Sequence, residues 1–140
     1  MASAGSALVA VATTAQILAP GAYVEFATNA ISKGMGIQHT TGSNSIGITV
    51  PGLYLVSVDA DVLPTVAGST TVALQNNGEA VPGAQATFTG VTATVTHISF
   101  TTIIRVRRSC DCIDNNALLQ VVAVEGSTIT NANITVVSVA

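Results

Sequence analysis

The feature of the sequence that most constrains the fold is the stretch 50–62, which reads VPGLYLVSVDADV. A Pro-Gly pair, typical of a turn, opens it. Apolar side chains then occupy every second position, namely Tyr54, Val56, Val58, Ala60 and Val62. The alternate positions begin apolar at Leu53 and Leu55 and end acidic at Asp59 and Asp61. Because successive side chains of a β-strand point to opposite faces, this pattern predicts a central strand of a sandwich with one face in the core.

Similar patterns along the chain predict an all-β fold. We expect roughly nine or ten short strands separated by turn residues, and no stretch has a convincing helical pattern. The clearest hairpin signal is Asn77-Gly78, because this pair supplies the two positive-φ positions of a type I′ turn. Pro82-Gly83 follows closely, which predicts a short returning strand. Strands at spacings of about ten residues with turns between them indicate a β-sandwich or barrel.

The composition indicates one domain that buries part of its surface against other copies. With 140 residues the chain is long enough for a single core. We expect that domain over 15–140, preceded over 1–14 by an N-terminal arm or edge strand. Only 8% of the residues are charged, against roughly 25% in ordinary soluble proteins, and the mean hydropathy is +0.61. No apolar run approaches the roughly 18 residues that a membrane span needs, so we expect no membrane partner. Because the chain is nevertheless rich in apolar residues and poor in charge, we expect a homo-oligomer.

The charges argue against a nucleic-acid partner. The net charge is -3, whereas binding to nucleic acid favours a basic face. The basic cluster of Arg105, Arg107 and Arg108 would make only a small phosphate footprint. Solvated arginines at a strand end are its simpler interpretation, and Arg105 and Arg107 are kept as interface candidates. Because no Lys or Arg precedes the short apolar run 8–12, we also expect no secretory signal peptide and synthesis in the cytoplasm.

The chain has 2 cysteines, Cys110 and Cys112, separated by Asp111. On an extended chain their α-carbons would lie about 6.6–6.8 Å apart, which is at the upper edge of disulfide geometry. Two thiolates and an aspartate are also too few for a four-coordinate zinc site. Unpaired loop cysteines are the default interpretation. A disulfide within or between subunits is one alternative, and a metal site assembled from several copies is the other.

Acidic residues and histidines give weak signals of chemistry. Asp59 and Asp61 share one face of the predicted strand, where they could begin a calcium site, but calcium needs roughly six to eight oxygen ligands. Solvated carboxylates at a strand end are the commoner explanation. His39 and His97 could join a distant Ser and Asp in a catalytic triad, yet no acid, base and nucleophile stand together in the sequence. We therefore expect no enzymatic activity, no resident metal and no cofactor.

Aromatic residues are few, and there is no Trp. The set consists of Tyr23, Tyr54, Phe26, Phe88 and Phe100. The three phenylalanines are expected in the core, and Tyr54 is expected in the core or near a symmetry axis. A glycan groove usually places exposed aromatic faces beside polar groups. A glycan partner is therefore possible but not indicated, and Tyr23 and Tyr54 are the candidate interface or ligand residues.

The order of several short motifs resembles a known family. The motifs are YVEF at 23–26, SNSIGI at 43–48, PGLYLV at 51–56, VALQNNGEAVPG at 72–83, ALLQV at 117–121 and ITV at 134–136. Over about residues 15–140 this order is similar to the bacterial and phage branch of the tumour-necrosis-factor-like, or complement-globular-head-like, jelly rolls. The C-terminal domain of spore-exosporium collagen-like glycoproteins is a relative of that branch.

The resemblance implies an antiparallel jelly-roll β-sandwich that assembles as a homotrimer around a three-fold axis. Members of the family are display, adhesion or ligand-binding heads and not enzymes, so no catalytic residue carries over. The sequence departs from the family by lacking a collagen stalk and by its scarce aromatics. The leading hypothesis is a trimeric decoration or accessory subunit of a larger particle, on the surface of a phage virion head or fibre. The alternative is a trimeric module on a bacterial cell or spore surface that binds a glycan or protein receptor.

Overall fold

The fold is built from β-strands. The computed structural model describes residues 5–34, 36–106 and 117–139, and these ranges contain twelve strands and no helix. The strands are β1 (Ala7–Ala12), β2 (Gln16–Leu18), β3 (Ala22–Tyr23), β4 (Thr28–Lys33), β5 (Ile37–Gln38), β6 (Ile46–Ile48), β7 (Gly52–Pro64), β8 (Gly68–Asn76), β9 (Glu79–Gly90), β10 (Thr96–Val106), β11 (Ala117–Ala123) and β12 (Ser127–Ser138). No described part of the chain forms a helix with the length and hydrophobicity needed to span a membrane.

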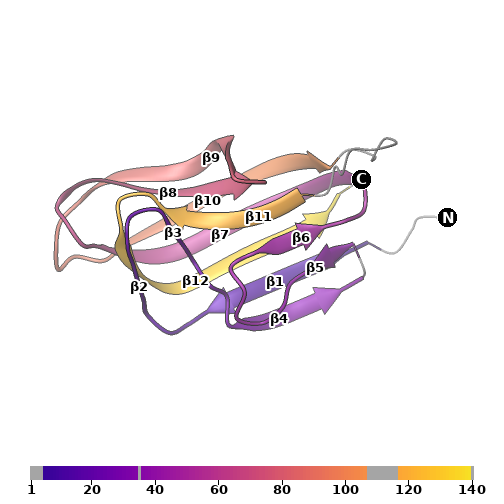
Figure 1. The fold of residues 1–140 in the computed structure, drawn as a ribbon, viewed down its shortest axis with the longest axis horizontal. Coiled ribbons are helices and arrows are strands. Elements are labelled where there is room, and N and C mark those ends of the chain that lie inside the picture. Colours follow the sequence, from indigo (N-terminus) through magenta and orange to yellow (C-terminus); the bar gives the residue numbers. More distant parts are fainter. Residues whose placement is uncertain (1–4, 35, 107–116, 140) are drawn as a thin grey trace.

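The strands form two antiparallel sheets that stack face to face (Figure 1). The first sheet has the order β10-β7-β12-β1-β4, and β2 also pairs with β12. The second sheet has the order β5-β6-β11-β8-β9, and β3 also pairs with β11. Strands adjacent in a sheet are often distant in the sequence, as β1 and β12 are. The prediction of an all-β sandwich is therefore confirmed.

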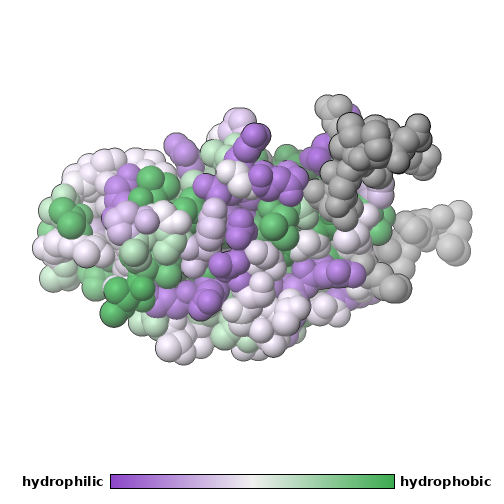
Figure 2. Space-filling model, viewed as in Figure 1, coloured by the Kyte–Doolittle hydropathy of each residue, from purple (hydrophilic) through white to green (hydrophobic). Residues whose placement is uncertain are grey.

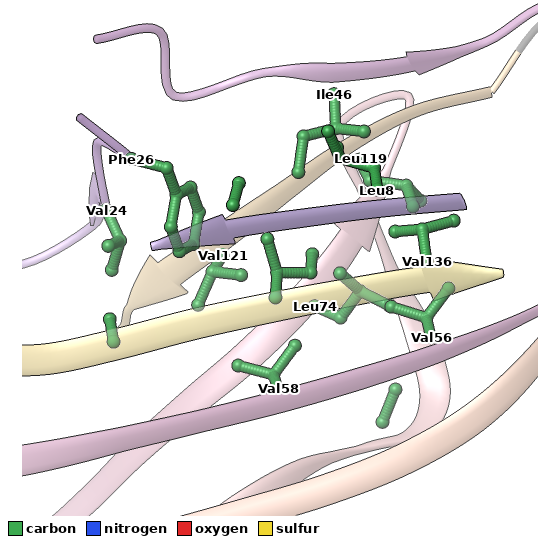
Figure 3. Close-up of a cluster of buried hydrophobic side chains, with 14 of the residues drawn as sticks. Leu8, Val24, Phe26, Ile46, Val56, Val58, Leu74, Leu119, Val121 and Val136 are labelled. Atoms are coloured by element: carbon green, nitrogen blue, oxygen red, sulfur yellow. The ribbon is translucent and has the colours of Figure 1, made fainter. Parts of the chain in front are cut away.

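The strand predicted from alternation is β7, which lies between β10 and β12 in the first sheet. Its alternating apolar side chains from Tyr54 to Val62 are at most 2% exposed. Figure 3 shows Val56 and Val58 in one buried cluster with Leu74 of the second sheet. Each fully buried aliphatic side chain of this size contributes about 1.5–3 kcal/mol. The apolar face of β7 thus forms the floor on which the second sheet packs.

The N-terminal segment does not have the position predicted for it. The sequence predicts an arm or edge strand over 1–14, but β1 is an interior strand of the first sheet. Val9 pairs with Thr135 of β12 on one side and with Ile31 of β4 on the other. Leu8 on β1 is fully buried in the core. The difference arises because β4, which has no clear alternation in the sequence, covers the backbone edge that would otherwise be free.

The β8–β9 hairpin has the predicted turn but a longer return strand. The turn residues Asn77 and Gly78 have φ of 54° and 83°, as a type I′ turn requires. The prediction of a short return strand is wrong, because β9 continues to Gly90. Pro82-Gly83 interrupts the pairing of β9 with β8, but β9 itself continues past it. The register shifts between Ala73 and Gln75 of β8, so the facing part of β9 forms a bulge.

Exposed aliphatic side chains gather at one end of the sandwich, at the left of Figure 2. The loops that join β7 to β8 and β9 to β10 lie at this end (Figure 1). They carry Val66, Val91 and Val95, which are 71%, 57% and 59% exposed. The fold therefore leaves apolar side chains exposed at this loop end.

Candidate functional site

The candidate site is the outer face of the first sheet, where side chains of β10, β7, β12 and β1 point away from the core. Strand pairing aligns them in three rows across the sheet. The first row is Ile103, Leu55, Val137 and Ala7; the second is Thr101, Ser57, Thr135 and Val9; the third is Ser99, Asp59, Asn133 and Val11. These residues together are named the sheet face. Asp59 is its one charged member.

The sheet face carries a single charge, is partly apolar and is incompletely covered in a single chain. Ile103 is 58% exposed, and Leu55 and Val137 beside it are half-buried. Ile31, which pairs with the last residue of the second row, is 54% exposed. Exposed apolar side chains that neighbour one another on a sheet are common at sites of contact with another molecule. Depletion of charge at the centre is the feature that distinguishes protein–protein interfaces in composition.

Asp61 lies on β7, two positions after Asp59 of the third row, and its carboxylate accepts two hydrogen bonds. His97 donates from Nδ1 to Oδ1 at 2.8 Å, and Asn131 donates from Nδ2 to Oδ2 at 3.2 Å. These bonds, the one from His97 first, lower the pKa of the Asp61 carboxyl. Each oxygen of Asp61 therefore accepts one hydrogen bond, and calcium binding by Asp59 and Asp61 stays a prediction. Within the described ranges, no three His, Cys, Asp or Glu side chains come together to hold a metal.

The two histidines have different surroundings. The His97 side chain is 62% exposed, and no hydroxyl of the described residues bonds to its second ring nitrogen. His39 bonds through Nδ1 to the Asn29 side chain and through Nε2 to the Ser43 carbonyl at 2.9 Å. Its ring also meets the edge of Phe26, with centroids 6.3 Å apart. His39 thus links the loop at Ser43 to the core. His97 bonds to a carboxylate, but no nucleophile of the described residues lies beside it.

The two tyrosines proposed as interface or ligand residues are not exposed platforms. Tyr54 is only 2% exposed, and its hydroxyl donates to the Val50 carbonyl at 2.6 Å. Burial raises the pKa of that hydroxyl. Of the two positions expected for Tyr54, the structure shows the core. Tyr23 is half-buried on the second sheet, where its hydroxyl donates to Gln75 Oε1 at 2.9 Å.

The remaining candidates lie at or beyond the end of β10. Arg105 is exposed on this edge strand, two positions after Ile103. Arg107, Cys110 and Cys112 lie outside the described residues, so their roles stay predictions. Sequence reasoning missed the sheet face and the His97–Asp61 pair. The alternation of β7 and β10 is visible in the sequence, but the register that sets their side chains next to each other is not.

No protein-family model matches the sequence, and no curated protein matches it. Solved structures do share the fold. Murine APRIL at pH 5.0 matches with a TM-score of 0.73 and 10% identity over 97% of this chain and 100% of that chain. The globular domain of zebrafish complement 1qA matches with a TM-score of 0.67 and 10% identity over 94% of each chain.

The PRD1 vertex protein P5 matches with a TM-score of 0.64 and 16% identity over 96% of this chain and 97% of that chain. At such identities the likeness shows the fold alone. The fold is therefore an antiparallel jelly roll of the kind found in tumour-necrosis-factor-like proteins and complement heads, with a phage vertex protein among its structural neighbours. This confirms the fold that the resemblance implied.

Proposed function

We propose that this chain is a non-enzymatic structural protein that forms a homotrimer and decorates or completes a larger particle, a phage virion head or fibre. The observation that carries the proposal is the sheet face, which is neutral in its first two rows and half-exposed in a single chain. The likeness to the PRD1 vertex protein P5 supports the role on a particle. The resemblance to trimeric jelly rolls supports the number of subunits.

Electrostatics favours self-association through the neutral rows. A three-fold axis brings three copies of each nearby residue together. Two like charges about 6 Å apart at an effective dielectric constant of about 20 repel by about 3 kcal/mol. The apolar and hydroxyl rows avoid this cost, whereas Asp59 in the third row would incur it. We therefore place the first two rows nearest the axis, with Asp59 and Arg105 toward its solvated margins.

The mass of the purified chain in solution tests the trimer. We expect sedimentation equilibrium at micromolar concentration to give three times the chain mass of 14.0 kDa. Thr101→Lys adds a charge to the second row and is expected to raise the dissociation constant by at least about tenfold. Thr89→Lys is the matched control, because Thr89 is an exposed strand threonine on the second sheet. A wild-type monomer, or equal effects of the two variants, would contradict the proposal.

The role on a particle is tested separately. Density-gradient sedimentation of the lysate in which the chain is naturally made is expected to show it in the same fractions as shell protein. Recovery of the whole chain as free trimer, with no share in any particle fraction, would contradict the decoration role and leave the trimer intact.

A further inference from the structure

A shallow, open hollow of about 300 Å³ lies between the β8–β9 hairpin and the C-terminal part of β10. Its polar lining comes from Asn76, Glu79 and Arg105, and its apolar lining includes Val81, Pro82 and Ile103. Ile103 ends the apolar row of the sheet face at the edge strand β10. The hollow therefore begins where the proposed subunit contact stops, and one chain supplies its walls.

The walls are fixed by the hairpin. At the bulge, Gly83 has φ of 79°, a left-handed conformation that glycine adopts without strain. This bulge bends β9 beside the end of β10 (Figure 1). At the turn, Asn77 N donates to the Leu118 carbonyl at 2.9 Å, and Leu118 N donates to Asn77 Oδ1 at 3.1 Å. Bulges often redirect side chains beside functional sites. The hollow is thus a built feature of the fold.

Three polar groups of the hollow have no recorded partner in the described part of the chain. Glu79 and Arg105 are exposed, and neither forms an ion pair with any described residue. Asn76 Oδ1 is buried and has no hydrogen-bond partner. A buried acceptor left without a donor costs about 1–3 kcal/mol.

We propose that this hollow binds a saccharide through adjacent hydroxyl groups. A simple anion would meet the Glu79 carboxylate, and a simple cation would meet the Arg105 guanidinium. A sugar hydroxyl both donates and accepts, so neighbouring hydroxyls can donate to Glu79 and accept from Arg105. The carbon-bound hydrogens of the ring pack against Val81 and Pro82, as in ligand sites that combine apolar walls with a few polar groups. This inference goes beyond the structural role and does not need the trimer, although three sites would raise the avidity for a glycan-coated surface.

The test begins with the full-length protein on an array of immobilised mono- and oligosaccharides. A sugar found there is then titrated into isotope-labelled protein while amide resonances are followed. We expect binding that perturbs residues 76–82 and 103–105. Glu79→Gln and Arg105→Gln are each expected to weaken binding by about tenfold, because each removes a charged hydrogen-bond partner. Glu25→Gln and Lys33→Gln are the matched controls, since both residues are exposed and lie outside the hollow.

Three results would overturn the proposal. The first is an array without any bound sugar. The second is perturbation of these residues by free glycine or sulfate and not by sugars, which would indicate a zwitterionic or anionic ligand. The third is equal affinity of the hollow variants and their controls. Sedimentation of the same variants distinguishes failure of sugar binding from failure of the trimer. Glu79→Gln and Arg105→Gln are expected to keep the wild-type mass whether or not they bind sugar.

Discussion

The two outer faces of the sandwich differ in how far the chain itself completes them. On the second sheet, β3 pairs with β11, and the Tyr23 hydroxyl donates to Gln75 Oε1 at 2.9 Å. Ala73 and Val122, which point outward between core positions, are nonetheless only 5% and 4% exposed. The short segment that carries Tyr23 thus helps the chain to cover its own second sheet.

The sheet face on the first sheet has no such completion. Of its described side chains, only Thr101 and Ser57 hydrogen-bond to each other, at 3.3 Å. Ile103 at its edge stays 58% exposed. Low charge therefore occurs in two different structural settings in this chain. On the second sheet it accompanies a cover supplied by the same chain, and on the first sheet it accompanies the surface that we propose for contact between subunits.

Substitutions in the core are expected to lower the free energy of unfolding much more than substitutions on the sheet face. Ile134 is fully buried, whereas Val137 points outward from the same strand. Ile134→Ala is expected to lower the free energy of unfolding by about 2–5 kcal/mol, because it leaves a cavity. Val137→Ala is expected to lower it by less than about 1 kcal/mol. Urea unfolding in the Thr101→Lys background, where subunit contacts are weakened, measures both. Similar losses would show that Val137 belongs to the core and that the sheet face is completed within one chain.

An intermediate effect is expected on the second sheet. Tyr23→Phe removes the hydroxyl that bonds to Gln75, which is expected to cost about 0.5–1.5 kcal/mol of unfolding free energy. The mass in solution should stay that of the wild type, because this face is completed within one chain. A change in mass with Tyr23→Phe would place a subunit contact on the second sheet instead.

The smallest effect concerns pH at the margin of the sheet face. Hydrogen bonds from His97 and Asn131 lower the pKa of Asp61 below its ordinary value of 3.8. A carboxyl whose pKa is lower in the folded state stabilises that state above the ordinary pKa and loses this contribution as pH falls through the folded pKa. The contribution is expected to be roughly 0.2–1 kcal/mol, because the pair is solvated. Urea midpoints of the wild type and Asp61→Asn should therefore converge below about pH 4. A constant difference down to lower pH would contradict this origin.

The parts of the fold that depend on nearby residues could be predicted from the sequence. The alternation from Tyr54 to Val62 placed β7 in the core, and Asn77-Gly78 placed the hairpin turn. In both cases the signal and the structure lie within a dozen residues of chain. Local chemistry also misled once, because Pro82-Gly83 looks like the end of a strand and is a bulge within β9.

The candidate site depends on pairings between distant segments, which the sequence does not display. Leu55 meets Val137 and Ile103 only through the registers of β12 and β10 against β7. His97 reaches Asp61, 36 positions away, through the same pairing. The interior position of β1 likewise depends on β12 at the other end of the chain. Alternation shows which side chains of one strand point the same way. Only the register shows which side chains of the neighbouring strands lie beside them.

Solvent access to the valine methyl groups of the sheet face shows whether other copies of the chain cover that face. A soluble paramagnetic agent broadens methyl resonances in proportion to their exposure. In the wild type, the methyl groups of Val9 and Val137 should be protected, while those of Val66, which is 71% exposed at the loop end, should broaden strongly. The protection should disappear in Thr101→Lys. If Val9 and Val137 of the wild type broaden as much in concentrated solution as they do in that variant, the sheet face is not covered by other copies and the account is contradicted.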